Sequence, residues 1–174
     1  MPNNSEENNV VLVGFMGAGK TTIGKLLAKS LCFSFIDTDE EIEKEEGMSI
    51  AQIFEKKGEE YFRELESDFI TNFRQSKCII STGGGMPCHK DNMAKLKVLG
   101  MVLFINTPYH SIIERLKLNQ DSRPLLESSL GNEKDELLSL FLKRQQIYKS
   151  SDKEVVGDKK PSSILEEIMK IVRG

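Results

Sequence analysis

The stretch Val10-Val11-Leu12-Val13-Gly14-Phe15-Met16-Gly17-Ala18-Gly19-Lys20-Thr21 joins an apolar run to a glycine-rich turn. Residues 10–13 predict a short strand that is buried on both faces, as in a parallel sheet. After Lys20 the pattern changes to apolar residues on one helical face, at Ile23, Leu26, Leu27 and Leu31. Residues 14–21 fit the pattern GxxxxGK[ST] and connect a predicted strand to a predicted helix, which is the setting that this motif requires.

Such a turn predicts a binding site for the phosphates of a nucleoside triphosphate. Its glycines let backbone N–H groups turn inward, and the helix adds the partial positive charge of its N-terminus. Lys20 supplies a mobile positive charge for the β- and γ-phosphates, and the Thr21 hydroxyl is a ligand for Mg²⁺. The predicted nucleotide contacts are Gly17, Ala18, Gly19, Lys20, Thr21 and Thr22.

The rest of the chain alternates strand-like and helical segments. Further strands are predicted at residues 33–36, 78–81, 101–105 and 154–156, with helical patterns between them. This alternation predicts an α/β fold, a three-layer α/β/α sandwich around a five-stranded parallel sheet. Two helix starts have the spacing of a capping box, Ser49 with Gln52 and Ser163 with Glu166.

Length and charge restrict the class of protein. The chain has 174 residues, with 24 Lys and Arg against 27 Asp and Glu, a formal net charge of −3. We therefore expect one domain over residues 10–174, preceded by a disordered polar tail at 1–9. The charge argues against a nucleic-acid partner, and no apolar run approaches the roughly 20 residues that span a membrane. We expect a cytoplasmic protein, and a monomer.

Several conspicuous residues have an unremarkable explanation. The three cysteines fit neither a disulfide framework nor a CxxC metal site, so we interpret Cys88 and His89 as ordinary loop and helix-start residues. His110 is expected on the surface at a helix start. The acidic run 40–46 is typical of a solvated helix face rather than of a cation site.

Three further segments carry chemistry. Asp37-Thr38-Asp39 ends the second strand, so both carboxylates can face the cleft at the carboxyl edge of the sheet, although Asp37 alone could simply cap the next helix. Glu66 follows Arg63 by three residues and can orient it, but an exposed helical pair has the same spacing. Ser81-Thr82-Gly83-Gly84-Gly85 is a second glycine-rich strand end, where backbone can approach a ligand closely or form a flexible turn.

Taken together, GFMGAGKTT, DTD, FRELE, STGGG, SRPLL and KRQQIY resemble the shikimate kinase family over essentially the whole chain from Val10 to Val172. The resemblance implies a P-loop kinase of the nucleoside-monophosphate-kinase type, with strand order 2-3-1-4-5. It implies the transfer of a phosphoryl group from MgATP to the 3-hydroxyl of shikimate, on the route to chorismate and the aromatic amino acids. It also implies an acceptor-binding region at about 37–75 and a lid at about 119–136.

The resemblance assigns a role to individual residues. Asp39, Lys20 and Arg123 are the implied catalytic residues, with Arg123 reaching the phosphates from the lid. Shikimate contacts are implied for Asp39, Arg63, Gly84, Gly85 and Arg144, with the rings of Phe54 and Phe62 as walls. Mg²⁺ is implied at Thr21 and, through water, at Asp37. Arg123 and Lys160 complete the implied ATP contacts.

Two positions depart from the family pattern, and two rival functions stay open. Many relatives carry an adenine-stacking arginine at the position of Leu116, which here lies between Arg115 and Lys117. The second adenine contact is matched only loosely, by Lys159-Lys160-Pro161.

One rival is a P-loop kinase for another small hydroxy-acid such as gluconate. The other is a nucleotide-binding regulatory module without catalysis, against which the intact set of predicted site residues argues.

Overall fold

The computed structural model describes residues 8–118 and 132–174. Within them a parallel sheet has five strands, in the order β2-β3-β1-β4-β5. The strands are β1 (Asn9–Val13), β2 (Ser34–Asp37), β3 (Cys78–Ser81), β4 (Gly100–Asn106) and β5 (Lys153–Val156). The predicted fold class and strand order are therefore confirmed, with β2 shifted by one residue from its predicted range.

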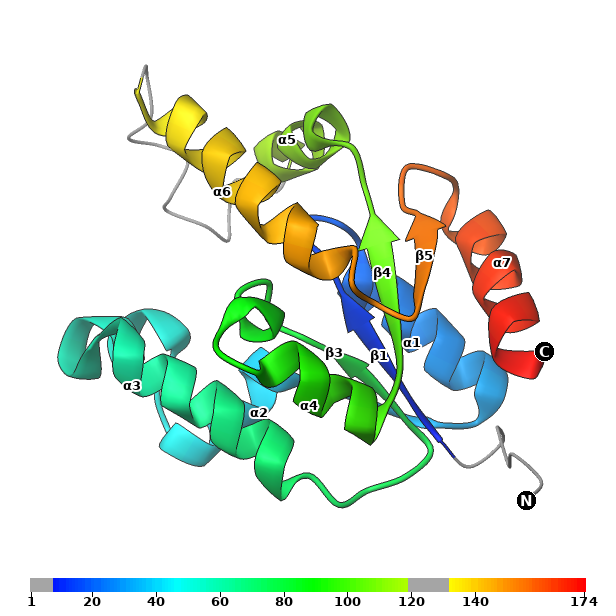
Figure 1. Ribbon diagram of the computed structural model, residues 1–174, viewed down its shortest axis with the longest axis horizontal. Coiled ribbons are helices and arrows are strands. Elements are labelled where there is room, and N and C mark those ends of the chain that lie inside the picture. The colour runs from blue at the N-terminus through cyan, green and yellow to red at the C-terminus, as the bar shows by residue number, and fades with distance from the viewer. Residues whose placement is uncertain (1–7, 119–131) are drawn as a thin grey trace.

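Strand β1 lies at the centre of the sheet and is buried along its whole length, as its apolar sequence predicts. Its side chains alternate between two hydrophobic cores: Val11 and Val13 belong to one, Val10 and Leu12 to the other. This alternation follows from the two-residue period of a strand. Because each core has its own covering helices, the molecule has three layers (Figure 1).

One layer consists of α1 (Lys20–Leu31) and α7 (Pro161–Arg173), which pack against each other and against the core of Val10 and Leu12. The other core is covered by five helices and the short helix η1 (Met86–Cys88). These helices are α2 (Thr38–Glu46), α3 (Ile50–Asn72), α4 (Asn92–Leu99), α5 (Tyr109–Leu118) and α6 (Asn132–Tyr148). The strand ends that carry the sequence motifs lie beneath this second layer.

The first predicted capping box is confirmed at α3, where the Ser49 side chain accepts from the Gln52 amide and the Gln52 side chain accepts from the Ser49 amide. Within α3 the backbone is non-helical at Gly58, with φ 84° and ψ 168°. The second predicted box is wrong, because α7 begins at Pro161 with Lys160 as its N-cap. Proline has no N–H that would need a capping acceptor, and its fixed φ suits the first helical position.

One expected boundary also changes, and the end of the expected lid range overlaps a helix. Asn9 belongs to β1 rather than to the tail, and its buried side chain bonds the Cys78 amide and the carbonyl oxygens of Gln75 and Leu99. Helix α6 begins at Asn132, so the last five residues of the range expected as a lid are helical. Residues 1–7 and 119–131, with Arg123, lie outside the described residues. In the described part of the chain, no helix has the length and apolar character needed to span a membrane.

Candidate active site

The turn between β1 and α1 has the backbone that a phosphate cradle needs. Gly19 is the N-cap of α1 in a left-handed conformation, with φ 101°, and no side chain caps the helix start. A Cβ on Gly14 would lie 2.8 Å from the carbonyl oxygen of Ile105, so this position also excludes any side chain. The N-terminus of α1 is therefore open to an anionic ligand.

Lys20 lies folded across this turn. Its Nζ donates to the carbonyl oxygens of Gly14 at 2.8 Å and of Phe15 at 3.0 Å, and the residue is buried. The ammonium group is thus held beside the turn by backbone acceptors, where a phosphate oxygen can replace them. The structure supports the predicted placement of Lys20 at the phosphates.

A chain of two hydrogen bonds connects the P-loop helix to the second strand. The Thr21 hydroxyl donates to Asp37 Oδ2 at 3.1 Å, and Asp37 Oδ1 accepts from the backbone amide of Asp39 at 3.1 Å. Asp37 therefore caps α2 and reaches Thr21 at the same time, so the predicted cap is confirmed and does not exclude the predicted role at the metal, which stays a prediction. A hydroxyl and a carboxylate at the phosphate end of α1 are the hard oxygen donors that suit Mg²⁺.

The glycine-rich end of β3 lies against Asp37-Thr38-Asp39. Thr38 is buried and its hydroxyl accepts from the Gly83 amide at 3.0 Å, so it points away from the cleft as expected. A Cβ on Gly83 would lie 2.5 Å from Asp39 Oδ1 and 3.2 Å from Glu66 Oε1. Only a residue without a side chain lets both carboxylates approach this loop, which explains the first glycine of the motif.

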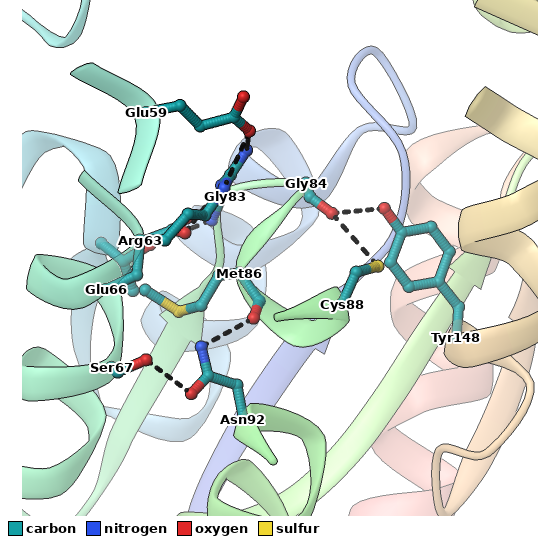
Figure 2. A network of polar contacts seen from close by, with 11 residues as sticks. Glu59, Arg63, Glu66, Ser67, Gly83, Gly84, Met86, Cys88, Asn92 and Tyr148 are labelled. Atoms are coloured by element: carbon teal, nitrogen blue, oxygen red, sulfur yellow. Dashed lines mark hydrogen bonds and ion pairs between the residues drawn. The ribbon is translucent and has the colours of Figure 1, made fainter. Parts of the chain in front are cut away.

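Arg63 is held on two sides by carboxylates of its own helix (Figure 2). Its Nη1 donates to Glu66 at 2.7 Å, while Nη2 and Nε donate to Glu59 at 3.0 and 3.3 Å. Glu66 is fully buried and the Arg63 side chain is 13% exposed, so the alternative of an exposed helical pair is wrong. Glu59 was missed from the sequence, although its position four residues before Arg63 is the detectable signal.

Glu66 has an unusual electrostatic environment. Burial raises its pKa from the usual 4.5 to about 7, despite the neighbouring Arg63 guanidinium, which lowers it. The negative charge of Asp39 raises it further, and the charge of Arg144 lowers it. Its Oε1 is buried and makes no hydrogen bond within the described part of the chain. These four ionisable side chains therefore form one coupled group.

The three glycines at 83–85 meet three of these side chains in turn. Asp39 lies over Gly83, Arg144 Nη1 lies 3.4 Å from the position of a Cβ on Gly84, and the Arg63 guanidinium lies against Gly85. Arg63 comes from α3 and Arg144 from α6, so the two cations approach the loop from different helices. Two guanidinium groups and one carboxylate around a glycine backbone suit a ligand that carries a carboxylate and hydroxyl groups.

Aromatic rings border the same site. The ring centroids of Phe54 and Phe62 lie 5.0 Å apart on α3, and the Arg63 guanidinium lies 5.4 Å from the Phe62 ring. The Arg144 guanidinium lies 5.8 Å from the ring of Phe15. These rings limit the directions in which the two arginines can point.

On the other side of the P-loop, α5 presents Arg115 rather than Leu116. Leu116 is buried and packs beside Gly17. Arg115 Nη1 donates to the carbonyl oxygens of Gly17 at 3.3 Å and Ala18 at 3.1 Å, and Nη2 donates to Gly157 at 2.8 Å. Position 116 thus lacks the arginine of the family pattern, but the preceding residue, Arg115, lies against the P-loop. Lys160 is exposed at the start of α7, and the described contacts do not connect it to the P-loop.

The other conspicuous residues of the sequence lie outside this site or have no chemical role in it. His110 is exposed as the second residue of α5, and the acidic run lies mostly exposed on α2, as expected. Cys88 ends η1, and burial raises the pKa of its thiol, which disfavours a reactive thiolate. A phosphate cradle between β1 and α1, linked by hydrogen bonds to the charged side chains that meet at the ends of β2 and β3, defines the protein as a P-loop phosphotransferase for a small molecule.

Comparison with known proteins agrees with this class and narrows it. The family model described as shikimate kinase matches residues 16–173, and the chain belongs to this family. The shikimate kinase of Persephonella marina is 46% identical, covering 95% of this chain and 99% of its own. The solved shikimate kinase of Bacteroides thetaiotaomicron has a TM-score of 0.87 at 30% identity, covering 97% of this chain and 99% of its own.

A third relative bears on the acceptor. The shikimate kinase of Acinetobacter baumannii, solved in complex with shikimate, has a TM-score of 0.85 at 32% identity over 95% of this chain and 93% of its own. The gluconokinase of Sinorhizobium meliloti has a TM-score of 0.59 at 15% identity, a likeness of fold alone. The chain is accordingly an ATP-dependent phosphotransferase that phosphorylates shikimate.

Proposed function

We propose that the two halves of the site hold the two substrates and align them for direct transfer. ATP places its phosphates on residues 17–22, with Lys20 at the β- and γ-phosphates. Shikimate lies over the glycines at 83–85. The oxygen of its 3-hydroxyl attacks the γ-phosphorus while its proton passes to Asp39, the bond from that phosphorus to the oxygen of ADP breaks, and shikimate 3-phosphate and ADP leave.

In this proposal the acceptor is oriented by one carboxylate and two arginines. Asp39 accepts a hydrogen bond from the ring hydroxyls and orients the attacking oxygen. Arg63 and Arg144 bind the substrate carboxylate, with backbone contacts from Gly84 and Gly85. The meeting of Asp39, Arg144 and Arg63 over three consecutive glycines supports this assignment.

Mg²⁺ belongs at Thr21, with Asp37 reaching it through water. When bound, the ion neutralises charge on the β- and γ-phosphates. The fit rests on the contact of Thr21 Oγ1 with Asp37 Oδ2, since both groups are oxygen donors suited to this ion. The hydrogen bond from the Asp39 amide to Asp37 then links the position of Asp39, which orients the acceptor hydroxyl, to that of Asp37 at the metal.

Further parts of the proposal concern the lid and the setting of the enzyme. Arg123 approaches the phosphates as charge develops on transfer, and Lys160 contributes on the adenine side. The protein works as a monomer in the cytoplasm, without a nucleic-acid or membrane partner. The net charge of −3 supports the absence of nucleic acid.

The observation that carries the proposal is the hydrogen-bonded link from Thr21 through Asp37 to Asp39, because it connects the donor and acceptor halves. The test is ADP release by purified protein with MgATP and shikimate, gluconate or buffer alone. We expect release well above the buffer rate with shikimate only. Equal release with gluconate would favour the rival acceptor, and release at the buffer rate with shikimate would refute the proposal.

A further inference from the structure

Tyr148 is the last residue of α6 and the last of the motif KRQQIY, and the mechanism above does not use it. Its side chain is almost completely buried, at 1% exposure, and its ring packs against Phe104 with the centroids 5.3 Å apart. Its hydroxyl donates to the carbonyl oxygen of Gly84 at 2.5 Å (Figure 2). Because a buried phenol hydroxyl needs a hydrogen-bond partner, this bond holds Tyr148 and the Gly84 carbonyl in fixed positions relative to each other.

The bond holds one peptide group of the glycine-rich loop. Every peptide bond described is trans, so the Gly84 carbonyl and the Gly85 N–H point in opposite directions. When Tyr148 holds the carbonyl, the Gly85 N–H is turned away from α6. In Figure 2 Tyr148 and Arg63 lie on opposite sides of Gly84, and the Arg63 guanidinium lies against Gly85, so we infer that this amide faces the side of the site that holds Arg63.

The amides of this loop are divided into bonded and available ones. The Gly83 amide donates to Thr38 and the Met86 amide donates to the Gly83 carbonyl. In the described part of the chain, the amides of Gly84 and Gly85 make no such hydrogen bond. A glycine pair without this anchor has many accessible backbone conformations, and ordering it on ligand binding costs free energy.

Tyr148 also couples this peptide to the second arginine. Arg144 precedes Tyr148 by four residues on α6, so both side chains lie on the same face of the helix. The Arg144 charge lowers the pKa of Tyr148, which shows their proximity, although burial raises that pKa more strongly. Arg144 lies at Gly84 as well. One helix end therefore places both a cation and an anchored peptide at the acceptor.

We propose that Tyr148 is a positioning residue for shikimate: its hydroxyl fixes the Gly84–Gly85 peptide so that the Gly85 amide faces the acceptor on the side of Arg63, while Arg144 from the same helix as Tyr148 lies at Gly84. Cys88 Sγ lies 4.0 Å from the same carbonyl, which is too weak a contact to replace the phenol. This proposal rests on the proposed acceptor site over the three glycines.

The test is Tyr148→Phe, which keeps the ring and its contact with Phe104 and removes only the donor. We expect the KM for shikimate to rise about tenfold, because the partly buried Gly84 carbonyl loses the one strong side-chain donor that it has among the described residues. The KM for ATP should stay within about twofold, since the P-loop keeps its contacts. Tyr61→Phe is the matched control, because its hydroxyl contacts Glu46 and Lys57 instead of the loop.

Two kinetic outcomes would overturn the proposal. One is an unchanged KM for shikimate in Tyr148→Phe. The other is a similar rise in the KM values for shikimate and for ATP together with a fall in thermal stability, because this combination indicates general damage to the fold. A measurement on the unmodified protein guards against poor folding of the variant. With ¹⁵N-glycine labelling, the Gly85 amide resonance should shift on adding shikimate, and a resonance that does not move refutes the proposal. If ADP release shows no activity toward shikimate at all, the proposed function fails first.

Discussion

Asp39 occupies a restricted position among the residues that meet the three glycines. Its carboxylate lies over Gly83, where any side chain would collide with it, and its backbone amide bonds Asp37. Its role therefore separates into a backbone part, which maintains the link to Thr21, and a side-chain part, which we propose faces the substrate.

The variant Asp39→Asn tests the side-chain part alone. We expect kcat for shikimate to fall about 10²- to 10⁴-fold, because an amide orients and deprotonates the hydroxyl poorly. The Kd for ATP, measured by calorimetry, should hardly change, since the amide bond to Asp37 is retained. Comparable losses in turnover and ATP binding would instead indicate a structural role.

Glu59 accepts hydrogen bonds from Arg63 Nη2 and Nε, which in the proposed site would bind the substrate carboxylate. Its side chain is 65% exposed, so the ion pair contributes little and is readily displaced. We expect Glu59→Gln to lower the KM for shikimate by about two- to fivefold with kcat unchanged, since competition for Arg63 decreases. Glu60→Gln is the matched control, because Glu60 contacts Lys90 and not Arg63. A raised KM in Glu59→Gln would show that Glu59 positions Arg63 instead.

At the scale of the element, α3 consists of two helical parts separated by Gly58. The φ of 84° and ψ of 168° lie in a region that is essentially restricted to glycine. The second part begins just after this break and carries Phe62, Arg63 and Glu66. The direction of that part decides whether Arg63 reaches Gly85.

We therefore expect Gly58→Ala to reduce the free energy of unfolding by about 1–3 kcal/mol and to raise the KM for shikimate. Ser49→Ala is the comparison, because it removes the capping box of the same helix at a cost of about 0.5–2 kcal/mol without touching the second part. Denaturant unfolding and steady-state kinetics on both variants provide the measurement. If the two variants have the same KM for shikimate, the break does not direct Arg63.

The element scale also shows where sequence patterns succeed. The strands and the capping box of α3 follow from local periodicity and from side chains within one turn, so they were predictable. The start of α7 was predicted three residues late, because Pro161 and Ser163 both mark helix starts and the sequence pattern does not rank them. Asn9 was assigned to the tail because its partners, residues 75, 78 and 99, are remote in the chain.

At the scale of the whole molecule, the burial of Glu66 makes the stability depend on pH. The pKa of Glu66 is about 7 in the folded protein against 4.5 ordinarily, so folding favours its protonated form. The resulting stabilisation is complete below pH 4.5 and is lost as the pH rises through 7. Glu66→Gln imitates the protonated form at every pH.

We therefore expect the free energy of unfolding of the wild type, minus that of Glu66→Gln, to fall by about 3 kcal/mol between pH 4 and pH 8. Other titrating groups largely cancel in this difference. Urea unfolding of both proteins at several pH values measures it. A difference that is flat, or that grows with pH, would mean that Glu66 is ionised throughout as the partner of Arg63.

The sequence by itself determined the strand, the glycine-rich turn and the helix of the P-loop, and with them the α/β class and a phosphate site. These features depend on neighbours within a few residues, and the residues 14–21 carry them completely. The motif order was also enough to indicate the family, because DTD, FRELE and STGGG are specific in combination. Asp39, Arg63 and Arg144 were named as acceptor residues from that resemblance.

Only the tertiary structure decided how these side chains meet. It placed Asp39, Arg144 and Arg63 over Gly83, Gly84 and Gly85 in turn, added Glu59 to Arg63, and presented Arg115 to the P-loop beside the buried Leu116. The hydroxyl of Tyr148 on the Gly84 carbonyl belongs to the same group of contacts. The physical reason is that each contact joins segments whose separation and helix rotation are set by packing on the sheet, and no local pattern encodes that rotation.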